Sequence, residues 1–183
     1  MNTEDLSTLR LLTDALAERA GHPVRRDGWL HWADSGAAHR WLVPSWERLA
    51  STSAAAGVGF FGEPRAGGLD DFPPGLESRV ADAAAEQAWL LAYLNVRFPD
   101  GSDGPHFANL VVITDRAAVR ALEDGAAHTE AVGRAPGAYE SIRIHRLTLT
   151  GPLTMRPAIR VDETLTIDYG SSPPTRTVEL GGA

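Results

Sequence analysis

The chain has 183 residues, 43% of them hydrophobic and 22% charged, a composition typical of one globular domain and too apolar for a disordered chain. Its net charge of −7 argues against nucleic acid or an anionic membrane as the main partner, because both bind basic surfaces. The absence of cysteine excludes disulfides, thiolate nucleophiles, cysteine-bound zinc and iron–sulfur clusters. The N-terminus lacks the pattern of a signal peptide, and no apolar run approaches the roughly 20 residues that span a bilayer. We therefore expect a cytoplasmic protein.

The N-terminal segment is predicted to be a helix over residues 3–20, because leucines such as Leu9, Leu12 and Leu16 recur there at helical spacing. Burying each leucine is worth roughly 1.5–3 kcal/mol, so the helix must dock on the domain or on a partner subunit. We treat residues 1–24 as an N-terminal helical arm.

The elements that follow are less regular up to residue 87. Residues 37–56 have a helical composition, but Pro44 either breaks this stretch or stands at the first position of a second helix. The predicted elements are a strand at 28–32, the helical stretch at 37–56, a strand at 58–62, a loop at 63–75 and a short helix from Leu76.

The second half of the chain carries the clearest strand signals. Two β-rich runs are joined by a turn of proline, glycine and aspartate over residues 99–105. Apolar side chains alternate almost without interruption over 158–169 and should share one face of a strand. The predicted elements are strands at 88–98 and 107–114, a helix at 115–134, strands at 139–150 and 158–169, and a loose tail at 171–183.

This order of elements predicts an α+β fold. Strand, helix, strand, strand, helix, strand is the βαββαβ pattern of a ferredoxin-like domain, in which helices cover one face of an antiparallel sheet. We assign residues 25–170 to this domain, with the N-terminal helix and a C-terminal strand as extensions.

Strand alternation also predicts what each face of the sheet carries. In the strands at 88–98 and 139–150, aliphatic residues alternate with aromatic, amide and basic ones. We expect the aliphatic faces to meet the helices and the other face to form a small-molecule pocket. The alternative is a half-exposed face, or one that packs against a second subunit. The predicted mixed face holds Trp89, Tyr93, Asn95, Arg97, Asn109, Arg143 and His145.

The late segments resemble a known superfamily. Residues 107–115 (FANLVVITD), a helix carrying His128, and residues 139–146 (YESIRIHR) are similar to the C-terminal half of dimeric α/β-barrel proteins. That superfamily includes antibiotic-biosynthesis monooxygenases, small polyketide cyclases and, more distantly, haem-containing aldoxime dehydratases and chlorite dismutases. The resemblance implies a homodimer whose two sheets face each other, with a pocket on each sheet.

Other motifs are weak. Gly57, Gly59 and Gly62 match G-x-G-x-x-G, but the dinucleotide fingerprint needs a strand before it and a helix after it, which this segment lacks. No pair of histidines has a compact metal-ligand spacing, so we expect no metal site. His145, beside Arg143, is the histidine most favoured for proton transfer near neutral pH.

The leading functional hypothesis is an enzyme of secondary metabolism acting on a hydrophobic or aromatic, polyketide-like molecule without a cofactor. The reaction would be oxygenation, as in a monooxygenase, or cyclisation or dehydration, as in a cyclase or lyase. His145 would act as acid or base and Arg143 would stabilise an oxyanion. The expected catalytic residues are His145, Arg143, Asn95 and Tyr93, and the expected substrate-binding residues are Trp89, Asn109, His128 and Trp32.

Two alternatives remain. The same scaffold could bind haem, with His128 or His145 as the axial ligand. It could also be a non-catalytic ligand-binding dimer, in which the partner's side chains fill the mixed face. All three hypotheses assume a homodimer that binds a small molecule rather than nucleic acid or membrane.

Overall fold

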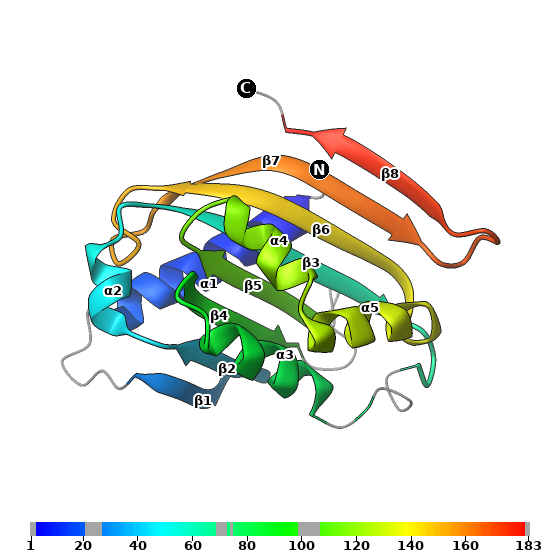
Figure 1. Cartoon of the computed structure of the whole chain (residues 1–183), viewed down its shortest axis with the longest axis horizontal. Helices are drawn as coiled ribbons and strands as arrows, with labels where there is room; N and C mark the ends of the chain where they lie inside the picture. Colours follow the sequence, from blue (N-terminus) through cyan, green and yellow to red (C-terminus); the bar gives the residue numbers. More distant parts are fainter. Residues whose placement is uncertain (1–2, 21–26, 69–72, 74, 99–106, 182–183) are drawn as a thin grey trace.

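A computed structural model describes residues 3–20, 27–68, 73, 75–98 and 107–181 (Figure 1). The helices in this part of the chain are α1 (Thr3–Ala20), α2 (Trp46–Ser51), α3 (Leu76–Ala85), α4 (Ala117–Glu123) and α5 (Ala126–Ala138). The strands are β1 (Gly28–Asp34), β2 (Ala37–Val43), β3 (Ala54–Pro64), β4 (Leu90–Arg97), β5 (Phe107–Ile113), β6 (Tyr139–Thr150), β7 (Ala158–Asp168) and β8 (Thr175–Leu180). No helix in these ranges is long and apolar enough to cross a membrane.

The strands form one open antiparallel sheet in the order β1-β2-β4-β5-β3-β6-β7-β8. The predicted ferredoxin-like βαββαβ fold and its dimeric barrel are therefore wrong, because an eight-stranded sheet replaces the expected four-stranded one. The β1–β2 pair extends the sheet at one edge and the β7–β8 pair at the other. The turn predicted at 99–105 lies outside the described residues.

Two segments account for much of this difference. Residues 37–43 were expected to be helical, but they form β2 between β1 and β4. Trp41 of β2 is fully buried, so its packing outweighs the helical composition of the segment. The helix starts only after Pro44, where the Ser45 side chain caps α2 by accepting a hydrogen bond from the Arg48 backbone N–H at 3.2 Å. The tail at 175–180 was expected to be loose, but it pairs with β7 as β8.

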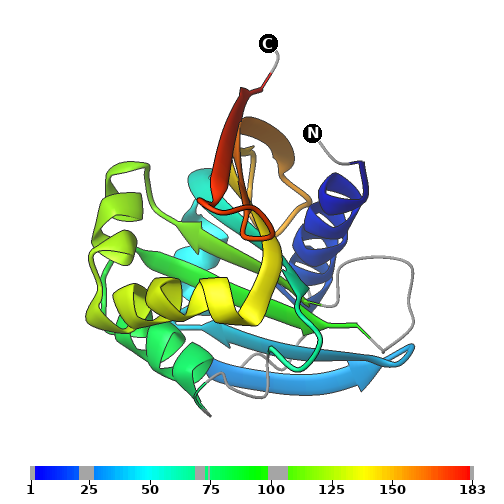
Figure 2. The same cartoon turned by 90° about the vertical axis from the view of Figure 1, so that its right-hand side faces the viewer.

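Helices cover both faces of the sheet, which overturns the expectation that they lie on one face only (Figure 2). Helix α1 packs its leucines on one face, where Leu9, Leu12 and Leu16 meet Trp41 and Phe61. Helices α3, α4 and α5 lie on the opposite face. We call these the α1 face and the three-helix face.

A β-bulge at Asp162 of β7, opposite the consecutive residues Arg146 and Leu147 of β6, changes which face the side chains of β7 meet. Strand β6 itself alternates regularly, with Ile144 on the three-helix face and Leu147 in the core under α1. The expectation that the apolar residues of 158–169 share one face is therefore wrong. Val161 packs under α1, while Ile167 packs on the three-helix face.

The glycine-rich stretch at 57–62 lies within β3, which begins at Ala54, before the strand expected at 58–62. Gly59 has a packing role, because a Cβ atom added there would lie 2.8 Å from Cδ2 of Leu9. The missing side chain lets α1 approach the sheet closely. The helix predicted at 115–134 is divided into α4 and α5, and Pro136 lies inside α5 rather than after it.

Candidate functional site

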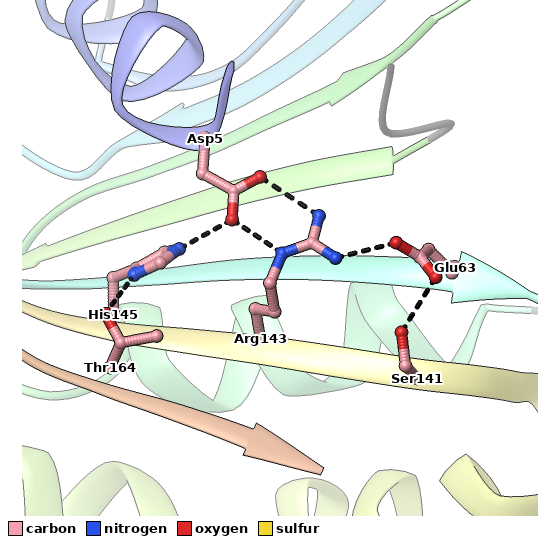
Figure 3. A network of polar contacts seen from close by, with 6 residues as sticks. All are labelled: Asp5, Glu63, Ser141, Arg143, His145 and Thr164. Carbon is pink, nitrogen blue, oxygen red and sulfur yellow. Dashed lines mark hydrogen bonds and ion pairs between the residues drawn. The ribbon is translucent and has the colours of Figure 1, made fainter. Parts of the chain in front are cut away.

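A network of buried polar side chains joins the first helix to the middle of the sheet (Figure 3). Asp5 stands in the first turn of α1 and accepts two hydrogen bonds from Arg143 of β6, at 2.7 Å from Nε and 3.1 Å from Nη2. His145 of β6 approaches the same carboxylate, with Nε2 2.8 Å from Oδ2. Its other ring nitrogen, Nδ1, lies 2.8 Å from Oγ1 of Thr164 on β7. Arg143 also donates to Glu63 of β3 at 2.7 Å.

The carboxylate of Asp5 is fully buried, yet it is ionised. Burial alone would raise its pKa, but the hydrogen bonds from His145 and Arg143 outweigh that effect and hold the pKa below its ordinary value. Hydrogen bonds to Asp5 and Glu63 likewise raise the pKa of Arg143. The half-exposed Glu63 has a lowered pKa because it accepts from Arg143. The guanidinium is thus committed to two carboxylates.

The ionised carboxylate determines the tautomer of His145. A carboxylate only accepts hydrogen bonds, so Nε2 of the imidazole must carry the proton that points to Asp5. In the neutral ring, Nδ1 is then unprotonated and accepts the hydrogen bond from the hydroxyl of Thr164. Hydroxyl, imidazole and carboxylate therefore follow one another in the order used to activate a hydroxyl for nucleophilic attack.

Thr164 connects this network to an open pocket of about 340 Å³ between α1 and the β7–β8 edge of the sheet. That volume lies near the lower end of the roughly 300–1,000 Å³ of small-molecule sites. His145 is fully buried and does not line the pocket, so it meets a bound molecule only through Thr164. The lining residues are Leu6, Ile159, Arg160, Val161, Thr164, Glu179, Leu180 and Gly181.

The structure brings together only part of the predicted mixed face. Arg143 and His145 lie on the α1 face, where both contact Asp5. Tyr93 packs in the apolar core of the three-helix face, and Asn109 hydrogen-bonds to its hydroxyl. The prediction that these residues form one surface is wrong. Alternation separates the two faces within a strand, but it does not say which face of one strand lies beside which face of another.

The predicted residues on the three-helix face form a second polar group. The hydroxyl of Tyr93 accepts a hydrogen bond from Nδ2 of Asn109, and Asn95 stands opposite Asn109 across the β4–β5 pair. Trp89 is partly buried against the same apolar cluster as Tyr93. Burial raises the pKa of Tyr93, so its hydroxyl stays protonated at neutral pH. Arg97, at the end of β4, is exposed.

Trp32 and His128, the remaining predicted binding residues, belong to neither group. Trp32 of β1 stacks on His39 with ring centroids 4.6 Å apart, and the guanidinium of Arg19 lies over its ring. Arg19 is 14 residues beyond Asp5 on α1, which places the two about 21 Å apart along the helix. His128 of α5 contacts the backbone oxygen of Glu123 through Nδ1 at 3.2 Å.

Both ring nitrogens of His145 are engaged by protein side chains, so it does not offer one to a haem iron. The haem hypothesis would then depend on His128 and stays a prediction. In the described ranges, no group of three or more histidine, aspartate or glutamate side chains is placed to hold a metal ion.

Sequence reasoning missed Asp5 and Thr164. Asp5 had a usable signal, because it lies four residues before Leu9 and so occupies a position in the buried leucine stripe of α1. A carboxylate in such a stripe needs a charged partner. Thr164 had no comparable signal, because the bulge between β6 and β7 alters the alternation around it.

Comparisons with known proteins identify no relative: no protein-family model, no curated protein and no solved structure matches the chain. The resemblance to dimeric α/β-barrel proteins finds no support in these comparisons. Function must be argued from the chain's own residues.

Proposed function

We propose that this protein is an enzyme that transfers an acyl group from a small, partly apolar substrate, with Thr164 as the nucleophile and His145 as the acid and base. The observation that carries the proposal is the hydroxyl–imidazole–carboxylate sequence of Thr164, His145 and Asp5, in which Thr164 is also a lining residue of the pocket. This keeps the acid–base role expected for His145, but it moves the reaction from the predicted mixed face to the α1 face.

Each side chain has one task in the reaction. As Oγ1 of Thr164 bonds to the acyl carbon, its proton passes to Nδ1 of His145. The imidazolium then returns that proton to the leaving group as its bond to the acyl carbon breaks. A water molecule, activated in the same way, attacks the acyl-threonine, and the hydroxyl regains its proton. Asp5 holds the Nε2–H of His145 and stabilises the imidazolium.

Arg143 takes a positioning role rather than the oxyanion-stabilising role expected from the sequence. Its guanidinium is bound by Asp5 and Glu63, and it does not line the pocket. By keeping Asp5 ionised, it fixes the tautomer of His145 that leaves Nδ1 free to accept a proton.

The pocket indicates the kind of substrate. Leu6 of α1 and Val161 of β7 give it apolar walls, and Leu180 of β8 is 78% exposed beside them. Arg160 and Glu179 add polar groups. A short apolar acyl chain suits such a site, because apolar walls with a few polar groups are what small-molecule pockets use.

The test compares two replacements of the same hydroxyl. Thr164→Val keeps the shape of the side chain but removes the nucleophile, whereas Thr164→Ser retains it. With p-nitrophenyl acetate, butyrate and hexanoate as substrates, we expect Thr164→Val to lower kcat/KM at least about 100-fold, the smaller end of the effect of acid–base catalysis. Thr164→Ser should retain turnover. Thr166→Val, two residues along β7, is the matched control and should behave as the wild type.

Mass spectrometry provides an independent measurement. Wild-type protein quenched during turnover should carry one acyl group on the peptide that contains Thr164, and Thr164→Val should carry none. Full turnover by Thr164→Val, or an acyl group on another residue only, would overturn the proposal.

A further inference from the structure

A second candidate site lies on the three-helix face, where buried amides lack partners. Asn95 and Asn109 face each other across β4 and β5 and are only 5% and 7% exposed. In the described part of the chain, Nδ2 of Asn95 and Oδ1 of Asn109 have no hydrogen-bond partner. The same holds for Oε1 of Glu77, which α3 brings over this face. We call Tyr93, Asn95, Asn109 and Glu77 the amide cluster.

Two of the residues that carry these unpartnered atoms interact through Tyr93. Asn109 is tied to Tyr93 by a hydrogen bond, and the charge of Glu77 acts on the hydroxyl of Tyr93. Leaving a buried donor or acceptor unpaired is destabilising, and nearly all such groups in folded proteins have a partner. Val111 of β5 packs in the apolar cluster of this face, and an aliphatic residue at position 95 or 109 would avoid the cost of an unpaired amide. The amides are thus better explained by a partner that binds between them.

The charges around the amide cluster are compensated, which points to a neutral ligand. Arg40 of β2 lies 3.9 Å from Glu77 and donates to Ser78 at 2.7 Å. Tyr93 keeps its proton because burial raises its pKa. What remains is one donor, Nδ2 of Asn95, and the acceptors Oδ1 of Asn109 and Oε1 of Glu77. An N–H group beside a C=O group would satisfy both amides.

Aromatic side chains lie beside the cluster. Phe60 of β3 stands opposite Asn109 and is only partly buried, although helices cover this face. Its ring meets Phe107 and Tyr139 edge-on, with centroids 6.1 and 5.7 Å away. Tyr93 packs with the apolar side chains of α3 and α4, and Phe60 with those of α5, so the cluster lies where these two groups meet the sheet. A small ring fits this setting of aromatic groups around a few polar atoms.

We propose that the amide cluster binds a small neutral molecule carrying an amide in a ring, a lactam. Oδ1 of Asn109 accepts from the lactam N–H, and Nδ2 of Asn95 donates to its C=O. This site is on the opposite face of the sheet from Thr164, so it does not depend on the proposed acyl transfer.

The test uses matched probes on the wild-type protein. In ¹H–¹⁵N NMR titrations, 2-piperidone should shift the side-chain amide signals of Asn95 and Asn109 saturably. N-Methyl-2-piperidone, which lacks the N–H, should bind about tenfold more weakly, since one lost hydrogen bond is worth about a factor of ten. Asn95→Leu and Asn109→Leu assign the two signals and should each abolish binding, while Thr164→Val should leave binding unchanged.

Two results would overturn the lactam site. One is equal binding of the two probes, or no saturable shift with either. The other is a crystal structure grown with 2-piperidone in which an ordered water bridges the two amides and the lactam is absent. Both measurements use the wild-type chain, so they decide the matter even where a leucine variant fails to fold.

Discussion

Replacing Asp5 by asparagine tests whether the buried network holds α1 on the sheet. Asparagine has nearly the same size as aspartate, so Asp5→Asn removes the negative charge with little change in packing. Arg143, whose side chain is 16% exposed, would keep its charge with only the half-exposed Glu63 beside it. His145 would lose its ionised acceptor.

The expected loss follows from the burial of these groups. Breaking a buried ion pair by removing one partner costs about 3–5 kcal/mol of unfolding free energy. The contact between Arg143 and Glu63 remains, so we expect a value near the lower end, about 3 kcal/mol. For a chain of 183 residues this corresponds to a fall in Tm of roughly 6–12 °C.

Urea denaturation and thermal melting at pH 7 measure this loss. Asp14→Asn is the control, because Asp14 is on the same helix and also pairs with an arginine, Arg156, but both side chains are well exposed. Exposed pairs contribute about 0–1 kcal/mol, so this variant should melt close to the wild type. If Asp5→Asn is no less stable than Asp14→Asn, the network does not hold α1 in place and the reasoning is wrong.

The other predictions concern pH, packing and the three-helix face. The lowered pKa values of Asp5 and Glu63 mean that their stabilisation is complete above the ordinary carboxyl pKa and is lost as pH falls through the lowered values. Urea denaturation should therefore show the wild type losing stability below about pH 4 and Asp5→Asn losing less; equal losses would contradict this. Gly59→Ala should cost about 1–3 kcal/mol, because its Cβ atom would crowd Leu9. Leu9→Ala should lower the unfolding free energy less in the Gly59→Ala variant than in the wild type, because the smaller side chain relieves the crowding. If the two losses simply add in urea denaturation, the two sites do not interact. Tyr93→Phe should cost about 1–2 kcal/mol by taking the acceptor from Nδ2 of Asn109. Tyr169→Phe, at a partly exposed ring, should cost less than 0.5 kcal/mol, and equal melting temperatures of the two variants would contradict the burial argument.

Elements with a strong repeat could be predicted from the sequence. Helix α1 shows the leucine stripe, and β4 to β6 alternate aliphatic with other residues, so their types were clear. β2 was not predictable from composition, since its Ala, His and Arg residues favour no strand and its pairing with β1 and β4 decides the structure. β8 is exposed along its whole length and is held only by β7 in the described sheet, so it lacks the apolar pattern that identifies a strand.

Only the part of the candidate site that lies on a single strand could be predicted from the sequence. Arg143 and His145 are two residues apart on β6, so alternation alone places them together. Asp5 is 138 residues from Arg143, and no local pattern reports that α1 would dock there. The sequence prediction placed residues of both faces on one surface. To decide which faces of two strands coincide, one needs the strand register and the positions of the bulges, and composition reveals neither.

The network contains more than the docking of α1 requires. Asp5, Arg143 and Glu63 already join the helix to β6 and β3, and they would do so without a histidine. His145 extends the network to Thr164, which is the point where it reaches the pocket. If the network served only to hold α1 on the sheet, aliphatic residues at positions 145 and 164 would do as well. Burying an imidazole and a hydroxyl costs free energy that their hydrogen bonds only offset. The two replacements should therefore differ. Replacing Asp5 should lower stability and turnover together, whereas Thr164→Val should lower turnover strongly and stability by only about 1–2 kcal/mol, the cost of one buried hydrogen bond.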